Sequence, residues 1–263
     1  MPASDGLSAP EAYLLLSLPG CDARKALKLG FMGLVLQGVL RLEIEDRPGF
    51  IRTRHIPHLR VALNPPERLP AVAASLVRVV RHSEPGGLMK DVLRHAQREY
   101  GKTLLGFMRD HLGPALVARG LAEPCRRRIL GIFSVASFAR IPAGDAEKIR
   151  IERLMRDAHS IPAYLDRDPA QAAALAAALG GAVLLVEELR PHYGALARAL
   201  RDRDTGASID GSWNSGDPGN IWDLGSVDFS CFDSGAFDSF DAGFADAGGG
   251  DDGGGGDGGS SGC

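Results

Sequence analysis

The segment GLVLQGVLRLEIE, residues 33–45, contains the change of periodicity that decides the fold. Apolar residues at helical spacing predict a helix over Lys25–Gln37. Gly38 follows at the position where a residue in the left-handed conformation commonly ends a helix. From Val39 to Glu45 apolar and polar residues alternate, which is typical of a strand. The segment therefore predicts a helix that ends at a glycine and continues directly into a strand.

A turn at Arg47-Pro48-Gly49 predicts that residues 50–56 return as a second strand, the ending of a winged helix-turn-helix unit. The pattern recurs, since LVLQGVL from Leu34 matches LVARGLA from Leu116 at an offset of 116 − 34 = 82 residues. A strand is expected over Arg128–Val135 after this second copy. The offset exceeds a solenoid repeat, so two related winged-helix-like units and a chance recurrence both stay open.

Helices are also expected around these units, and the Ala-rich one has Asp168 as its N-cap and Pro169 as its first residue. Residues 172–186 read as a buried helix, too short and too rich in alanine to span a bilayer. The predicted fold is mainly α (α+β), a compact helical body with small β-hairpins. The remaining helices are expected over residues 10–18, 69–81, 88–100, 146–158 and 191–203.

Charge divides the chain into two unlike parts. All 30 Lys and Arg lie within residues 1–203, whereas 12 of the 33 acidic residues lie in residues 204–263. Residues 1–203 thus hold 33 − 12 = 21 acids and carry 30 − 21 = +9, and the tail carries −12. We predict an N-terminal arm over 1–10, a body over 11–203, and a disordered Gly-rich acidic tail over 204–263, because the tail has too few apolar residues to offset its ordering entropy.

The basic body predicts an anionic partner, either lipid headgroups or nucleic acid, because Lys and Arg attract phosphate in both. Basic residues gather in Arg47–Arg60, in Cys125–Arg128 and in the helix Lys148–Arg156. A solvated surface without a ligand is the alternative. For DNA, the expected recognition helix is Leu104–Arg119, which carries Arg109, His111 and Arg119.

The sequence contains no motif that points to catalysis or to a cofactor. It has no P-loop, GxSxG or HExxH, and no GxGxxG after a strand. His55 and His58 lack the further ligands that a metal site needs and are expected to be surface histidines. The four cysteines show no CxxC spacing, and no signal peptide is recognised. We therefore expect a cytoplasmic protein that is not an enzyme and that needs no metal or cofactor.

Residues 11–203 resemble the Golgi phosphoprotein 3 family, which has bacterial members. The similar segments are EAYLLLSL from Glu11, GLVLQGVLRLE from Gly33, LGPALVARGLAEPCRRRILGIF from Leu112 and DPAQAAALAAALGGAVLLVEEL from Asp168. The resemblance implies a compact, mainly helical protein. It also implies peripheral membrane association, because the eukaryotic members bind phosphatidylinositol 4-phosphate on a basic face and insert a hydrophobic hairpin.

The family's lipid pocket uses one Trp and three Arg, and most of these positions differ here. Leu18 aligns with the Trp and Leu27 with the first Arg, while Gly106 and Arg109 align with an Arg-x-x-Arg pair. Only Arg109 matches, and Arg24, Lys25 and Lys28 are near enough in sequence to substitute. The predicted anion-binding residues are Arg24, Lys25, Lys28, Arg109, Arg126, Arg127 and Arg128.

A weaker resemblance is to uncharacterised bacterial proteins that have two winged-helix-like units and a Gly-rich tail. The functional hypothesis is a noncatalytic peripheral module that binds anionic lipid headgroups, with a DNA-binding winged-helix regulator as the alternative. For the tail, we expect an intramolecular competitor for the basic body, held at millimolar effective concentration by its tether. A role in solubility alone is the other interpretation of the tail. No oligomeric state is predicted.

Overall fold

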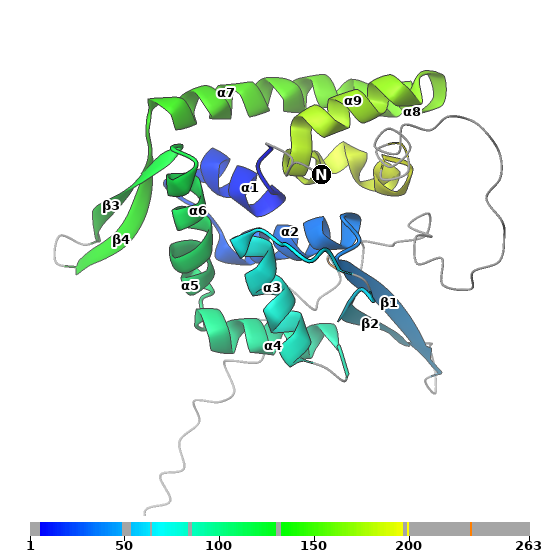
Figure 1. Ribbon diagram of the computed structural model, residues 1–263, viewed down its shortest axis with the longest axis horizontal. Helices are drawn as coiled ribbons and strands as arrows, with labels where there is room; N and C mark the ends of the chain where they lie inside the picture. Colours follow the sequence, from blue (N-terminus) through cyan, green and yellow to red (C-terminus); the bar gives the residue numbers. More distant parts are fainter. Residues whose placement is uncertain are drawn as a thin grey trace, which may run out of the picture.

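The computed structural model describes residues 6–48, 54–63, 65–83, 86–129, 133–196, 199 and 232. These residues form a helical body and two small antiparallel sheets, as predicted. Figure 1 shows the two hairpins on opposite sides of the body. The α-helices and strands are α1 Ala9–Ser17, α2 Ala23–Leu36, β1 Leu40–Arg47, β2 Arg54–Val61, α3 Ala71–His82, α4 Met89–Tyr100, α5 Leu105–Phe107, α6 Gly113–Ala118, β3 Ala122–Ile129, β4 Phe133–Arg140, α7 Pro142–Asp157, α8 Ile161–Arg167 and α9 Pro169–Leu179.

Shorter helical segments join these elements. A π-helix, η1 (Met108–Leu112), links α5 to α6, and three 3-10 segments follow α7 and α9. These are η2 (Ala158–Ser160), η3 (Gly180–Leu185) and η4 (Glu187–His192).

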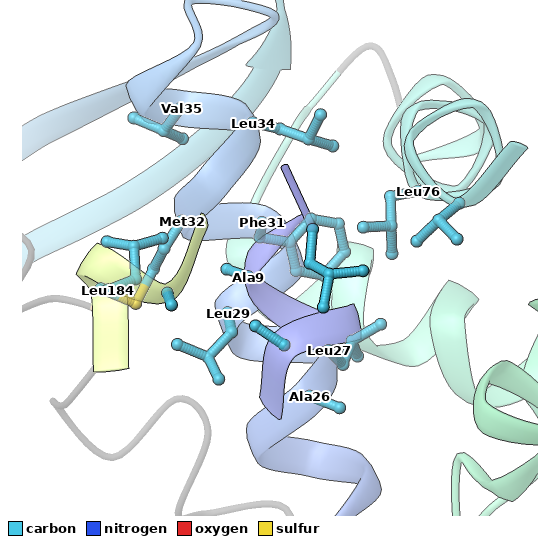
Figure 2. Close-up of a cluster of buried hydrophobic side chains, with 14 of the residues drawn as sticks. Ala9, Ala26, Leu27, Leu29, Phe31, Met32, Leu34, Val35, Leu76 and Leu184 are labelled. Atoms are coloured by element: carbon cyan, nitrogen blue, oxygen red, sulfur yellow. The ribbon is translucent and has the colours of Figure 1, made fainter. Parts of the chain in front are cut away.

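Helix α2 is the centre of the hydrophobic core. Its sequence ARKALKLGFMGLVL has apolar residues on nearly every side, and Leu27 and Phe31 are fully buried. Figure 2 shows Phe31 and Leu34 directed toward Leu76 of α3, while Met32 lies beside Leu184 of η3. A helix that is apolar all round is stable only when other elements cover it, which α1, α3 and η3 do here.

The two units share one order of elements, a helix, a glycine and a two-stranded hairpin, although the second helix is interrupted by a π-helical turn. Strand β1 covers residues 40–47 and β3 covers residues 122–129, so their bounds differ by 122 − 40 = 82 residues. Helix α2 at residues 23–36 corresponds in the same way to α5, η1 and α6 at residues 105–118, since 105 − 23 = 82. Both hairpins pair two strands of eight residues.

The hydrogen bonds that end the two equivalent helices also correspond. The amide of Gly38 donates to the carbonyl of Val35 at 3.0 Å, and the amide of Gly120 donates to that of Val117 at 2.9 Å. Both glycines have positive φ, 69° and 66°. The prediction of a left-handed glycine after each helix is therefore confirmed, and the chain contains two copies of one helix–glycine–hairpin unit.

Replacing Gly38 or Gly120 with valine is expected to lower the free energy of unfolding by about 1–2 kcal/mol, because a β-branched Cβ crowds the left-handed region. A Cβ on Gly120 meets no atom within 4 Å, so its cost comes from the backbone conformation alone. Gly20 is the control: its Cβ also meets nothing within 4 Å, and its φ is not positive. Urea unfolding of the three variants measures the effect, and equal stability of G120V and G20V would contradict this interpretation.

Several predicted boundaries were wrong. The strand expected over Arg128–Val135 spans the connection between β3, which begins at Ala122, and β4, which begins at Phe133. The helix expected over Leu104–Arg119 contains the π-helical turn η1. The helix expected from Pro191 to Arg203 starts instead as 3-10 segment η4 at Glu187, and only its part up to residue 196, with residue 199, is described.

The Ala-rich segment begins as predicted and ends earlier. The Asp168 carboxylate accepts a hydrogen bond from the amide of Gln171 at 3.0 Å, and Pro169 occupies the first turn. The α-helix stops at Leu179 because Gly180 has φ 56°, and the chain continues as the tighter segment η3. Most of residues 172–186 are buried, as predicted. They form two elements, α9 and η3, instead of one helix.

The two predicted termini are described only in part. Of the N-terminal arm predicted over residues 1–10, residues 1–5 lie outside the described residues. In the described part, Leu7 and Ala9 are buried. The predicted disordered tail, residues 204–263, lies outside the described residues except for Phe232.

Candidate functional site

Hairpin β3–β4 carries the predicted cluster Arg126–Arg128. These arginines pair in register with Ala136, Val135 and Ser134, none of which is charged. The hairpin, residues 122–140, holds four arginines and one acid, Glu123, for a net charge of 4 − 1 = +3. Arg126 is exposed, while the side chains of Arg127 and Arg128 lie outside the described part of the chain. Strand β3 therefore concentrates positive charge that its own partner strand does not neutralise.

Arg140, the fourth arginine of this hairpin, has a structural role at its base. Its Nε donates to the Asp145 carboxylate at 2.9 Å. Its Nη1 donates to the carbonyls of Leu15 at 3.0 Å and Leu18 at 2.7 Å. These bonds tie the end of β4 to the end of α1 and to the start of α7, so the hairpin leaves the body in a fixed direction (Figure 1).

Hairpin β1–β2 differs because several of its described charges are paired across and along the strands. Arg47 Nε lies 2.8 Å from a Glu45 oxygen, and Arg60 Nε lies 3.6 Å from a Glu43 oxygen. Hydrogen bonding to Arg47 lowers the pKa of Glu45, so this carboxylate is ionised at neutral pH. The basic segment Arg47–Arg60 predicted from sequence is thus electrostatically mixed once folded.

The predicted residues of α2 lie in its first two turns. Asp22 caps this end by accepting a hydrogen bond from the Arg24 amide at 2.9 Å. The Lys25 ammonium lies 5.2 Å from the centre of the Tyr13 ring, within the range of a cation–π contact. Lys25 is exposed, and Arg24 and Lys28 are half-buried. This end of α2 therefore presents a small basic surface.

Arg109 is exposed on η1, but its charge is compensated. Its Nε and Nη2 each donate to an oxygen of Asp110 at 2.7 Å. This hydrogen-bonded pair lowers the pKa of Asp110 and raises that of Arg109, so both groups stay charged and neutralise one another. Arg109 is the one residue that matches the family's Arg-x-x-Arg pair, and its guanidinium is hydrogen-bonded to Asp110.

The other positions of the family's lipid pocket are closed here. Leu27 has no exposed surface, and Leu18 is 8% exposed. A Cβ at Gly106 lies 2.6 Å from the Tyr100 carbonyl oxygen, so no arginine fits there without movement of the backbone. Helices α2 and α5 do contact each other at this place, but through apolar side chains. The aligned pocket is therefore part of the core.

Arg119, another residue of the predicted recognition helix, belongs to the packing of the N-terminus. Its Nε lies 3.4 Å from an oxygen of buried Glu11, and its Nη2 donates to the Gly6 carbonyl at 3.4 Å. Burial and the nearby Arg78 lower the pKa of His111, so this imidazole adds no positive charge at neutral pH. The exposed side of α5, η1 and α6 thus offers little free charge to a phosphate backbone.

His58 is buried, which corrects the expectation of a surface histidine. It is 7% exposed; its Nδ1 lies 2.7 Å from the Gly86 carbonyl and its Nε2 lies 3.0 Å from a Glu45 oxygen. A carbonyl and a carboxylate only accept hydrogen bonds, so both contacts are satisfied together when both ring nitrogens carry protons. His58 joins the hairpin to the loop before α4. The local sequence shows only that His58 precedes the apolar Leu59 in a strand. It gives no sign of the contact with the Gly86 carbonyl.

An aromatic cluster supports the turn into η1. The Tyr100 ring lies 5.2 Å from the Phe107 ring and 5.5 Å from the His111 ring, measured between centres. Burial raises the pKa of Tyr100 to about 12. Leu104 precedes α5 with φ 59°, a strained conformation for leucine. The three rings therefore pack the end of α4 against α5 and η1.

The predicted residues lie on separate elements: α2, η1 and β3. Strand β3 contacts α6, and α5 contacts α2. Figure 1 shows β3, β4, α5 and α6 together on one side of the body. Among the described residues, no group of three or more His, Cys, Asp or Glu side chains is arranged to hold a metal ion.

No family model matches the chain, and no curated protein matches it. Across the described residues, no one helix has both the length and the apolarity needed to cross a bilayer. One pair of helical segments, Pro169–Leu185 and Glu187–Leu196, meets these requirements only when taken together, and it is bent by 117°.

Proposed function

We propose that this protein is a noncatalytic peripheral module that binds anionic lipid headgroups, phosphoinositide-like ones included, through a basic surface centred on strand β3. The observation that carries the proposal is the run Arg126–Arg128 on a hairpin of net charge +3 that stands away from the helical body (Figure 1). A basic residue close to an anionic bilayer contributes about 1 kcal/mol to binding.

The sequence next to these arginines also suits a bilayer. Residues 129–135 read ILGIFSV and contain no charge. A hairpin with an uncharged end and arginines before it combines headgroup attraction with apolar contact. Lys25 and Lys28 on α2 extend the basic surface of the body, while Arg109 contributes little because Asp110 neutralises it.

Binding to DNA has less support from the geometry. Helix α2, which corresponds to a recognition helix in the first unit, is almost wholly buried. Its counterpart in the second unit carries the neutralised Arg109 and the structural Arg119. A recognition helix needs a free face with bases for the phosphate backbone and side chains for the base edges.

Co-sedimentation with vesicles containing phosphatidylserine tests the proposal. Three charge reversals, R126E/R127E/R128E, are expected to weaken binding about 100-fold, since about 3 kcal/mol corresponds to about two factors of ten. The matched control reverses three exposed bases elsewhere, R81E/K90E/R98E on α3 and α4, and changes the net charge by the same amount. The control is expected to lose less than about tenfold.

Equal losses in the two triple variants would contradict a site on β3 and indicate attraction by net charge alone. Tighter binding to duplex DNA than to the vesicles at the same salt concentration would favour the DNA-binding alternative. Circular dichroism spectra of both variants show whether the fold is retained.

A further inference from the structure

One residue of the acidic tail belongs to the core of the body. Phe232 has no exposed surface, and it is part of the same cluster of buried apolar side chains that contains Leu27 and Phe31. It is separated from residue 196 of the body by 232 − 196 = 36 residues. A phenylalanine so far along a Gly- and Asp-rich segment that is fully buried in the core of the body marks a point of contact between the tail and the body.

We infer that the body has an acceptor site for an aromatic side chain, and that its occupant is the chain's own tail, anchored by Phe232. The ligand is a Phe-Asp segment: residues 232–234 read FDS, residues 237–239 repeat FDS, and residues 240–242 read FDA. The buried ring supplies the apolar contact, and the tail sequence on either side of it is acidic, whereas residues 1–203 carry a net charge of +9.

The tether allows this contact within one molecule. For a random coil, a separation of 36 residues in sequence corresponds to a root-mean-square span of about 30–36 Å. The radius of gyration of a 200-residue domain is about 16 Å, so such a chain reaches most of the surface of the body. A short tether also holds its segment at about millimolar effective concentration, which favours the contact over a second molecule at ordinary protein concentrations.

An apolar anchor behaves differently from attraction between opposite charges. Salt screens exposed charges over about 8–10 Å and so releases a tail that is held only by its aspartates. A buried aromatic ring is not released by salt. The anchor therefore distinguishes this inference from a purely electrostatic tail, and it does not depend on which anion the basic surface binds.

The chain provides its own reporter, because both tryptophans, Trp213 and Trp222, lie in the tail. Tryptophan fluorescence anisotropy of the full chain therefore measures tail motion without a label. We expect F232A to lower the anisotropy and to increase the rate of proteolytic cleavage within the tail about tenfold. F237A removes a phenylalanine from the same local sequence, FDS, and is the matched control that leaves both quantities unchanged.

Anisotropy of the parent chain is expected to persist at about 1 M NaCl and to be independent of protein concentration. Equal anisotropy and cleavage in F232A and F237A would overturn the inference. Loss of the difference at high salt would show an electrostatic tail, and a dependence on protein concentration would show that a second copy is the occupant; either result also overturns it. F232L retains an apolar side chain and is expected to give intermediate values, which separates loss of the anchor from unfolding.

Discussion

Replacement of Leu27 with arginine is expected to destabilise the protein by at least about 4 kcal/mol, a large part of the roughly 5–15 kcal/mol that stabilises an ordinary domain. Leu27 lies on the central helix α2 and has no exposed surface. Figure 2 shows it within the apolar cluster between α2 and its neighbours. An arginine there is either buried without a partner or displaces the packing around α2, and both are costly.

This variant is informative because the family resemblance places an arginine at the same position. If the aligned lipid pocket existed, Leu27→Arg would be tolerated and would strengthen phosphoinositide binding. The controls are L27M, which conserves volume and is expected to cost less than about 1.5 kcal/mol, and K28R, which puts a guanidinium on the next, half-exposed residue. Chemical denaturation of the three variants gives the comparison. A stable L27R protein would contradict the assignment of this position to the core.

Replacement of Gly181 with alanine is expected to cost at least about 3 kcal/mol, the upper end of what overpacking costs. A Cβ at this residue lies 2.1 Å from the Ala9 amide nitrogen and 2.4 Å from the Ser8 carbonyl carbon. Both are backbone atoms, so no side-chain rotation relieves the overlap. The Gly181 amide also donates to the Leu7 carbonyl at 3.0 Å, and separating η3 from the start of α1 breaks this bond.

Gly33 supplies a control of opposite sign. It is inside α2, and a Cβ there makes only ordinary contacts, 3.8 Å from Leu184 and 3.9 Å from Ala9. Alanine at this position is expected to stabilise the protein by about 0.5–1 kcal/mol, because it removes the entropic cost of glycine in a helix. Thermal unfolding of G181A and G33A measures both. A melting temperature for G181A equal to that of the parent would show that η3 does not pack on α1 through backbone contact.

The sequence predicts the helix ends of the two units well because these signals are local. Gly38 and Gly120 each follow a helix end in the left-handed conformation that favours glycine. The alternation of apolar and polar residues after Gly38 predicts the start of β1 to within one residue. The Asp168-Pro169 pair marks a helix start for the same kind of reason. Each of these features depends on neighbours within four or five residues, so no tertiary information is needed.

The parts that the sequence did not predict depend on distant contacts. Whether Leu27 and Gly106 line a pocket or the core is decided by the packing of α2 against α5. His58 is buried because the loop at Gly86, 28 residues later, accepts its hydrogen bond. Phe232 is buried in the cluster that contains Leu27 and Phe31, a distant contact that its local sequence FDS does not reveal.

The sequence predicted which basic residues form the candidate anion-binding site, but not how they are arranged. The arginine run on β3 is visible in the sequence, and its placement on a projecting hairpin needed the fold. The neutralisation of Arg109 by Asp110 is a bidentate contact between adjacent residues of the π-helical turn, which the sequence analysis did not anticipate.

The central claim, that a basic surface binds anionic lipid, is tested most directly by vesicle binding of the full chain across a salt series. Binding to vesicles that contain phosphatidylserine is expected to exceed binding to phosphatidylcholine vesicles at low salt and to fall steeply between about 0.05 and 0.5 M NaCl, because added salt shortens the screening length. Equal partitioning of the protein to both kinds of vesicle at every salt concentration would contradict the account.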